Sequence, residues 1–242
     1  MPILEVKNLS MHFGELAALE DINLSVEKGE ILGLIGPNGA GKTTFFNCIT
    51  GFLNATRGDI FYKEQNITRC GPHRVCKLGI CRTFQIVQSF NEMTALENVM
   101  MGAFCRHHLT GDAREKAEEI LQFTGLHDKK HQLAGGLTLA DQKRIELART
   151  IATEPEVILL DEVMAGLNPT ETEEAIRLIQ KVHEKGLTII VVEHVMEVIM
   201  KISHRIAVFD SGELIVDGPP EEVVQDERVI KAYLGEEYHA ES

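Results

Sequence analysis

The sequence contains a glycine-rich stretch that reads Gly36-Pro37-Asn38-Gly39-Ala40-Gly41-Lys42-Thr43-Thr44. It matches the pattern G-x-x-x-x-G-K-[ST], and it lies between an apolar strand-like segment, 30–35, and a segment with helical spacing, 42–49. Glycines in such a loop let backbone N–H groups converge on phosphate oxygens, and the start of the following helix adds its positive dipole end. The stretch therefore predicts a nucleotide-phosphate site, in which Lys42 supplies charge to the terminal phosphates and Thr43 offers a hydroxyl to Mg²⁺.

A second segment supplies the acids that such a site needs. The apolar run 157–160 is strand-sized and ends directly at Asp161 and Glu162. We expect Asp161 to hold Mg²⁺ through water, and Glu162 to orient or deprotonate the attacking water. Two acids after an apolar strand are otherwise usually an exposed strand end, so this prediction depends on the glycine-rich stretch.

Strand-like and helix-like segments alternate along the chain. Strand patterns cover 30–35, 58–62, 157–160, 188–192 and 205–209, and helical patterns cover 42–49, 94–104, 112–124, 141–152, 170–184 and 194–202. The first thirty residues alternate apolar and polar side chains and predict a hairpin. We expect an α/β fold with a mostly parallel sheet core, an N-terminal antiparallel β subdomain and an inserted helical subdomain. Residues 1–242 are expected to form one domain, and the helical lobe is expected over about 67–140 because that stretch has no strong strand.

Composition and charge exclude several classes of protein. The chain has 242 residues, with 24 Lys and Arg against 37 Asp and Glu, which gives a net charge of −13. It has no long basic stripe, so nucleic acid is not expected as a partner. No eighteen-residue apolar run and no N-terminal signal pattern are present. We therefore expect a cytoplasmic protein, which reaches a membrane only by docking on a membrane-spanning partner.

The cysteines are expected to be reduced thiols. Their number is odd and no secretory signal precedes them; they are Cys48, Cys70, Cys76, Cys81 and Cys105. Cys70, Cys76 and Cys81 lie close in sequence to His73, but they contain no CxxC pair. Because that spacing matches no common zinc pattern, no zinc site is predicted.

The chain resembles the ATP-binding subunits of ABC transporters over nearly its whole length. The glycine-rich stretch and the acid pair carry the resemblance, and further motifs follow in the family's order. The resemblance implies that Phe13 stacks on adenine, that Gln85 senses the γ-phosphate and binds Mg²⁺, and that His194 contacts the γ-phosphate. It also implies an ABC-type P-loop NTPase that hydrolyses ATP. The implied partners are a second ATPase subunit and transmembrane permease subunits, at the inner face of the cell membrane.

Four further strings narrow the resemblance. They are GICRTFQ at 79–85, MTALENVMMGAF at 93–104, AGLNPTE at 165–171 and IKAYLGEEY at 230–238. They resemble the ATPase subunits of branched-chain amino-acid importers, which have relatives for urea, amides and other small polar solutes. The tail also resembles the ATPase of a lipopolysaccharide exporter. RTFQ followed by EMTALENV favours the amino-acid group, and the exporter stays the alternative.

The chain departs from the family at the signature motif LSGGQ, which contacts the ATP held by the partner subunit. The family places 24 positions between the motif's leucine and the strand-end Asp, and 24 positions separate Leu137 from Asp161, whereas 28 separate Leu133 from it. Spacing therefore selects 137–141 over 133–137. In that register Thr138 keeps a hydroxyl donor, Leu139 and Ala140 replace the glycines, and Asp141 replaces the glutamine.

This departure leaves two functions open. The resemblance implies that Thr138, Ala140 and Asp141 face the partner's ATP, where Asp141 would add negative charge, unless it caps its own helix and points away. Losing one preorganised donor typically costs about 10²–10³ in rate, so hydrolysis is expected to be weak. A homodimer would carry the defect in both sites, and a heterodimer would keep one competent site. The alternatives are a working ATP-driven motor and a weakly hydrolysing regulatory half-site.

Overall fold

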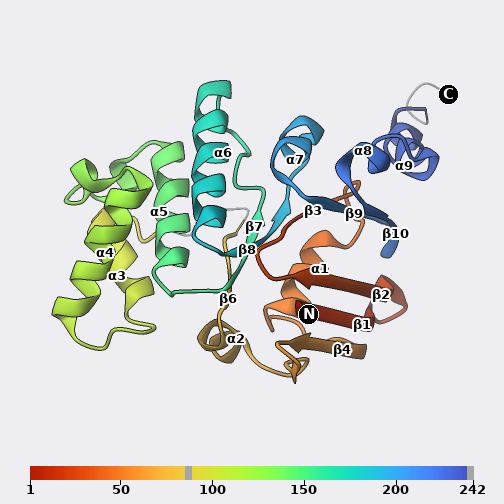
Figure 1. Ribbon diagram of the computed structural model, residues 1–242, viewed down its shortest axis with the longest axis horizontal. Coiled ribbons are helices and arrows are strands. Elements are labelled where there is room, and N and C mark those ends of the chain that lie inside the picture. Colours follow the sequence, from red (N-terminus) through yellow and green to blue (C-terminus); the bar gives the residue numbers. More distant parts are fainter. Residues whose placement is uncertain (85–88, 239–242) are drawn as a thin grey trace. The chain divides into compact units, whose positions relative to one another are not determined.

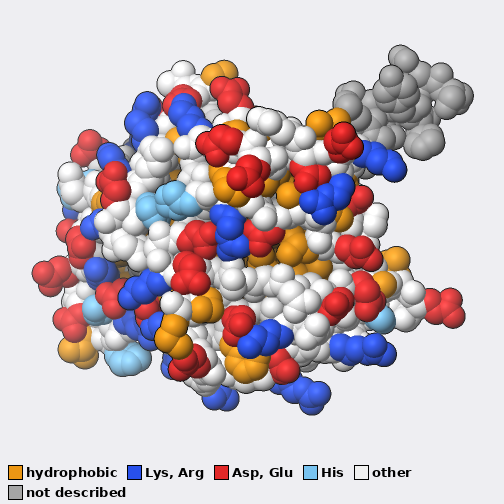
Figure 2. Space-filling view, turned by 45° about the vertical axis from the view of Figure 1, so that its right-hand side comes forward, with side chains coloured by type: hydrophobic (Ala, Val, Ile, Leu, Met, Phe, Trp, Pro, Cys, Tyr) orange, Lys and Arg blue, Asp and Glu red, His pale blue; other side chains and the backbone are white. Residues whose placement is uncertain are grey.

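The structure is a computed structural model that describes residues 1–84 and 89–238 (Figure 1). The chain forms two compact units: the first comprises Met1–Val75 and the chain from Thr188 onward, and the second comprises Cys76–Leu187. The expected boundaries of the helical lobe, 67–140, stay a prediction. Within the described ranges, no helix is long and apolar enough to cross a membrane. On the face shown in Figure 2, acidic and basic side chains are interspersed.

The first unit contains a four-stranded antiparallel sheet in the order β2-β1-β4-β5. Its strands are β1 (Pro2–Phe13), β2 (Leu16–Glu27), β4 (Arg57–Tyr62) and β5 (Gln65–Asn66). β1 pairs antiparallel with both β2 and β4, so the predicted N-terminal hairpin is confirmed. The apolar side chains of the alternating pattern are buried, among them Leu4, Val6 and Leu24.

The same unit holds the parallel strands that carry the glycine-rich stretch. β3 (Ile31–Ile35) runs parallel to β8 (Thr188–Val192) on one side and to β9 (Arg205–Asp210) on the other, and β10 (Glu213–Gly218) pairs antiparallel with β9. Every residue of β3 and β8 is buried, as expected for strands covered on both faces.

Helices of the first unit cover these strands. They are α1 (Lys42–Ile49), α7 (Met196–Ile202), α8 (Pro220–Val223) and α9 (Glu227–Tyr238). The rings of Phe45 in α1 and Phe209 in β9 pack edge to face with centroids 5.2 Å apart. This packing fixes α1 beside the sheet, so the loop between β3 and α1 lies at the carboxyl end of β3, where α/β proteins bind their ligands.

The second unit is mostly helical. Its helices are α3 (Ala95–Ala103), α4 (Thr110–Thr124), α5 (Leu139–Ile151) and α6 (Pro169–Glu184), with 3-10 turns at His127–Lys129 and Ala134–Gly136. Figure 1 shows α3, α4 and α5 packed side by side, around a core that includes Val99, Leu121 and Ile145. α2 (Pro72–Leu78) leads into this unit. The alternation of parallel strands with helices, together with the antiparallel N-terminal sheet, confirms the predicted fold class.

The second unit also contains two parallel strands, β6 (Ile80–Arg82) and β7 (Val157–Asp161). β6 lies inside the stretch 67–140, for which the sequence predicts no strong strand. It is three residues long, too short for an alternating pattern, and its pairing with β7 makes it a strand. Because β6 and β7 are parallel, both strands end at the same edge. Residues 83–84, which follow β6, and Glu162, which follows β7, therefore begin at that edge.

Candidate functional site

The glycine-rich loop is shaped by its glycines. At Gly36 a Cβ would lie 2.1 Å from the backbone oxygen of Phe209, and at Gly41, with φ +99°, it would lie 2.6 Å from that of Ala18. Gly39 has φ +81°, and nothing lies within 4 Å of the position its Cβ would take. Two glycines therefore let the loop pack directly on neighbouring backbone, and the third faces an open space.

Lys42 is the first residue of α1, and its side chain reaches back to this loop. Its Nζ donates to the carbonyl oxygens of Gly36 at 2.6 Å and Pro37 at 2.9 Å, and the residue is only 7 % exposed. Among the described residues, no side chain caps α1, and its first turn has no acid. An ammonium group and a helix start without a competing carboxylate are the groups that hold phosphates, so this loop fits an anionic nucleotide tail.

The remaining loop residues differ in burial. Ala40 is buried, Pro37 and Thr44 are half-buried, and Asn38 and Thr43 are exposed. The hydroxyl of the predicted Mg²⁺ ligand, Thr43, therefore belongs to an exposed residue in the first turn of α1.

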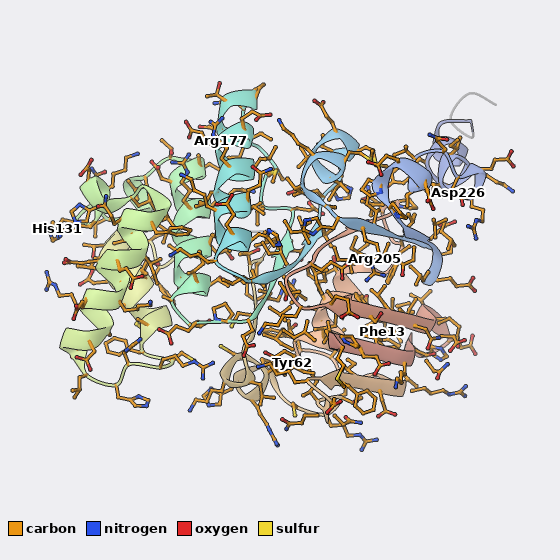
Figure 3. All side chains as sticks on the ribbon, in the orientation of Figure 1. Phe13, Tyr62, His131, Arg177, Arg205 and Asp226 are labelled. Atoms are coloured by element: carbon orange, nitrogen blue, oxygen red, sulfur yellow. The ribbon has the colours of Figure 1, made fainter. Side chains whose placement is uncertain are left out.

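Two more predicted site residues belong to the first unit. Phe13 is the last residue of β1, pairs with Leu16 of β2, and is 48 % exposed (Figure 3). His194 is exposed and lies between β8 and α7. An exposed aromatic ring and an exposed imidazole are accessible to a ligand, and neither side chain belongs to the core.

The predicted acid pair lies in the second unit, at the end of β7. The carboxylate of Asp161 accepts a hydrogen bond from Arg82 Nη2 at 2.8 Å, and its backbone N–H donates to Thr83 Oγ1 at 3.2 Å. Burial lowers the pKa of the Arg82 guanidinium, and the charge of Asp161 opposes that shift. Arg82 and Thr83 therefore fix the position of Asp161, which is itself 2 % exposed.

Glu162 follows with a strained backbone. Its φ is +49°, in the left-handed region that side-chain-bearing residues seldom adopt. Its carbonyl oxygen accepts a hydrogen bond from Lys143 Nζ of α5 at 3.1 Å. Backbone strain of this kind collects at functional positions, where surrounding contacts hold it in place. Sequence reasoning missed both Arg82 and Lys143, because their partners lie far away along the chain.

The signature-motif position lies at the start of α5. Thr138 is the N-cap: its Oγ1 accepts from the backbone N–H of Asp141 at 3.2 Å and donates to Asp141 Oδ2 at 3.0 Å. The expectation that Asp141 caps the helix is therefore wrong, because the helix begins at Leu139. Asp141 Oδ2 also lies 2.5 Å from Lys129 Nζ. Its charge is thus paired, and no local pattern in the sequence indicates this pair.

Ala140 is buried in α5, and Leu139 is exposed beside Gly166, where an added Cβ would lie 3.1 Å from Leu139 Cδ2. Gln85, predicted to sense the γ-phosphate, lies outside the described residues.

The predicted site residues fall into separate groups. In the first unit, Lys42 and Thr43 lie together with the loop glycines. In the second unit, Asp161 lies beside Glu162, and Thr138 lies beside Asp141. The buried parallel strand, the glycine loop and the start of α1 define a P-loop nucleotide-binding protein.

Comparison with known proteins identifies the family. The family model "ABC transporter" matches residues 19–165, and "Branched-chain amino acid ATP-binding cassette transporter" matches 213–239. A similar curated protein is the high-affinity branched-chain amino acid transport ATP-binding protein BraF of Pseudomonas aeruginosa, 41% identical over 252 residues, with 97% of this chain and 98% of the relative covered. This chain belongs to the ABC transporter family, whose ATPases hydrolyse ATP coupled to transport.

Two solved structures are similar in fold. One is the ADP conformation of an ATP-binding cassette of an ABC transporter, with a TM-score of 0.89 and 32% identity over 97% of this chain and 99% of that chain. The other is a dimeric ATP-binding cassette in a post-hydrolysis state bound to ADP and Pi, with a TM-score of 0.81 and 26% identity over 90% and 98%. The predicted family and fold are confirmed, and the second of these structures is a dimer bound to ADP and Pi.

Proposed function

We propose that this chain is the ATP-hydrolysing subunit of a membrane importer for branched-chain amino acids or a related small polar solute. The carrying observation is the loop around Lys42, in which an ammonium group and an uncapped helix start lie together. The solute class is supported by the likeness to BraF and by the family match over 213–239.

Each predicted site residue has a proposed role toward ATP. Lys42 and the N–H groups of 36–44 hold the ATP phosphates, and the exposed ring of Phe13 stacks on adenine. Thr43, Asp161 and Gln85 would hold Mg²⁺, which would supply positive charge to the phosphate groups. Glu162 orients or deprotonates the attacking water, and His194 contacts the γ-phosphate. Arg82 contributes by fixing Asp161.

Two such subunits are proposed to close around ATP. Thr138, Ala140 and Asp141 of one subunit face the nucleotide held by the other, so ATP favours the closed dimer by binding it more tightly than the open one. Hydrolysis removes that preference and reopens the dimer. Transmembrane permease subunits, on which the dimer docks at the inner face of the membrane, convert this cycle into transport.

One observation favours the working motor over the half-site. The added charge of Asp141 is offset by Lys129, with 2.5 Å between Nζ and Oδ2, so the motif is not left with a bare carboxylate. Leu139 and Ala140 in place of glycines are the feature that favours the half-site. The combined variant Leu139→Gly, Ala140→Gly and Asp141→Gln distinguishes the motor from the half-site. A gain of about tenfold or more in the ATP hydrolysis rate indicates the half-site, and no gain indicates the motor.

Calorimetry and turnover test the nucleotide site. Lys42→Ala is expected to lose magnesium-ATP binding, whereas Lys28→Ala, which changes an exposed lysine, serves as the matched control. Glu162→Gln is expected to keep ATP binding and lose turnover. Unchanged magnesium-ATP binding in Lys42→Ala, or unchanged turnover in Glu162→Gln, would contradict the proposed nucleotide site.

Uptake tests the solute. Proteoliposomes that contain this chain with its permease subunits are expected to take up labelled leucine in an ATP-dependent manner, and the Glu162→Gln complex is expected not to. ATP-driven release of lipopolysaccharide instead would establish the exporter.

A further inference from the structure

Three cysteine side chains meet in the second unit. Cys76 lies near the end of α2, Cys81 in the middle of β6, and Cys105 in the turn after α3. The sulfur atoms of Cys76 and Cys81 are 3.3 Å apart, those of Cys76 and Cys105 are 4.0 Å apart, and all three are free thiols. Cys76 and Cys81 are neighbours in sequence, and the turn after α3 adds Cys105, so three oxidisable groups form one cluster.

The turn between α2 and β6 holds the first two together. Gly79 has φ +118°, and its carbonyl oxygen accepts hydrogen bonds from the backbone N–H groups of Glu156 and Val157, at 2.9 and 3.0 Å. This anchors the turn to the start of β7. The two sulfur atoms thus face each other across a fixed bend, without a long loop that has to close.

The surroundings distinguish the two thiols. Contact with Cys76 lowers the pKa of Cys81, burial opposes this, and the Thr153 hydroxyl, 3.0 Å from the Cys81 sulfur, lowers it further. The same contact raises the pKa of Cys76. Arg106, whose Nε donates to the Thr153 carbonyl at 3.0 Å, adds positive charge nearby. Thiolate character, the property that governs thiol reactivity, is therefore concentrated on Cys81.

We propose that Cys76 and Cys81 form a redox-active dithiol that a hydroperoxide closes to a disulfide. The Cys81 thiolate attacks the peroxide O–O bond, gains an OH group as a sulfenic acid and releases water once the leaving oxygen is protonated. The Cys76 sulfur then attacks the Cys81 sulfur and displaces hydroxide, which leaves as water with the Cys76 proton. Two thiols are oxidised by two electrons in total, and one hydrogen peroxide becomes two waters.

The disulfide acts on the support of Asp161. Cys81 precedes Arg82, whose guanidinium holds the Asp161 carboxylate, and Cys81 pairs with Ile158 of β7. Closing the gap from 3.3 Å to an S–S bond of about 2.05 Å pulls β6 toward α2, next to that ion pair. Oxidation is therefore expected to lower ATP turnover several-fold, a consequence that rests on the proposed function.

Peptide mapping tests the bond without reference to activity. Trypsin cuts after Arg74, Lys77 and Arg82, so Cys76 and Cys81 fall in separate peptides, 75–77 and 78–82, and Cys105 in 83–106. After hydrogen peroxide and alkylation under denaturing conditions, a linked pair of 75–77 and 78–82 is expected, which dithiothreitol releases. Only alkylated thiols, or a link from 75–77 to 83–106 instead, overturns the proposal.

Controls come from the same chain. Cys48, whose pKa burial raises to about 11, is expected to stay reduced, and Cys48→Ser to leave the linked pair unchanged. Cys76→Ser is expected to abolish the pair and to make turnover resistant to peroxide. A disulfide that forms without changing turnover refutes the link to Asp161. Absent turnover in the reduced wild type counts against the proposed function and leaves the mapping result standing.

Discussion

Arg82 Nη2 lies 2.8 Å from Asp161 Oδ2, and the two side chains are only 6 % and 3 % exposed. A buried pair of this kind is costly to break by removing one partner, because the other is left as an uncompensated buried charge. The pair joins β6 to β7 at the edge where the strands end. The pair therefore stabilises the second unit and also holds in place the Asp161 carboxylate, which we assign to Mg²⁺.

Replacing Arg82 is expected to destabilise the protein strongly. Arg82→Met should lower the free energy of unfolding by about 3–5 kcal/mol, since it leaves the Asp161 carboxylate without its guanidinium partner. Urea denaturation measures this. Arg114→Met is the control: that side chain is 56 % exposed in an ion pair with Glu118, so a change within about 1 kcal/mol is expected. Equal losses in both variants would contradict the prediction.

Two helical glycines of the second unit are expected to respond in opposite ways. At Gly102 in α3 an added Cβ would lie 2.1 Å from the backbone oxygen of Arg149 in α5, so Gly102→Ala should cost about 1–3 kcal/mol by forcing the helices apart. At Gly111 in α4 nothing lies within 4 Å, and Gly111→Ala should gain up to about 1 kcal/mol from helix propensity. Thermal unfolding of the two variants checks this, and a loss at Gly111 as large as at Gly102 would be inconsistent with it.

Lys129 is expected to matter for turnover. Lys129→Met removes the ion pair to Asp141 and leaves that carboxylate's charge at the proposed contact with the partner's γ-phosphate. Turnover should fall by about tenfold, which corresponds to about 1.4 kcal/mol of activation free energy. Adding Asp141→Gln should restore it. Lys130→Met, which changes the neighbouring lysine paired with Glu118, is the matched control and should leave turnover unchanged.

The His12–Glu20 pair predicts a pH dependence. The hydrogen bond from His12, 2.7 Å from Glu20 Oε2, lowers the pKa of Glu20 below its ordinary value of 4.5. A depressed folded-state pKa gives stability that is present above the ordinary pKa and lost as the pH falls through the folded value. The destabilisation caused by His12→Ala should therefore shrink below about pH 4.5. NMR titration should place the Glu20 midpoint higher in His12→Ala than in the wild type; identical midpoints would refute the pair's effect.

The elements around the phosphate loop were predictable because their signals are local. The pattern of 36–44 and its apolar and helical flanks lie in one continuous stretch, and α1 begins and ends at the expected residues. α5 begins at Leu139, directly after Thr138 and two residues before the start of the predicted helical pattern 141–152. Contacts that join distant residues were not predictable. Lys129 lies twelve positions before Asp141, and no local pattern indicates that the two meet.

The cysteines illustrate the same limit. Closeness in sequence grouped Cys70 with Cys76 and Cys81, whereas the structure adds Cys105, which the packing of α3 brings to the cluster. β6 was not predicted because three residues are too few to show periodicity. For the same reason the hydrogen bond between Arg82 and Asp161 was not predicted. The pairing of β6 with β7 creates the strand and brings Arg82 to Asp161, and a pattern along the sequence does not show which strands pair.

The bare first turn of α1 has a practical consequence. No acid and no capping side chain lie there among the described residues, and Lys42 lies beside it. We therefore expect small inorganic anions to compete with nucleotides for the amides of this turn. Affinities for ATP measured in phosphate or sulfate buffers should therefore come out weaker than those measured in Tris chloride at equal ionic strength. The choice of buffer is a variable in every binding experiment on this protein.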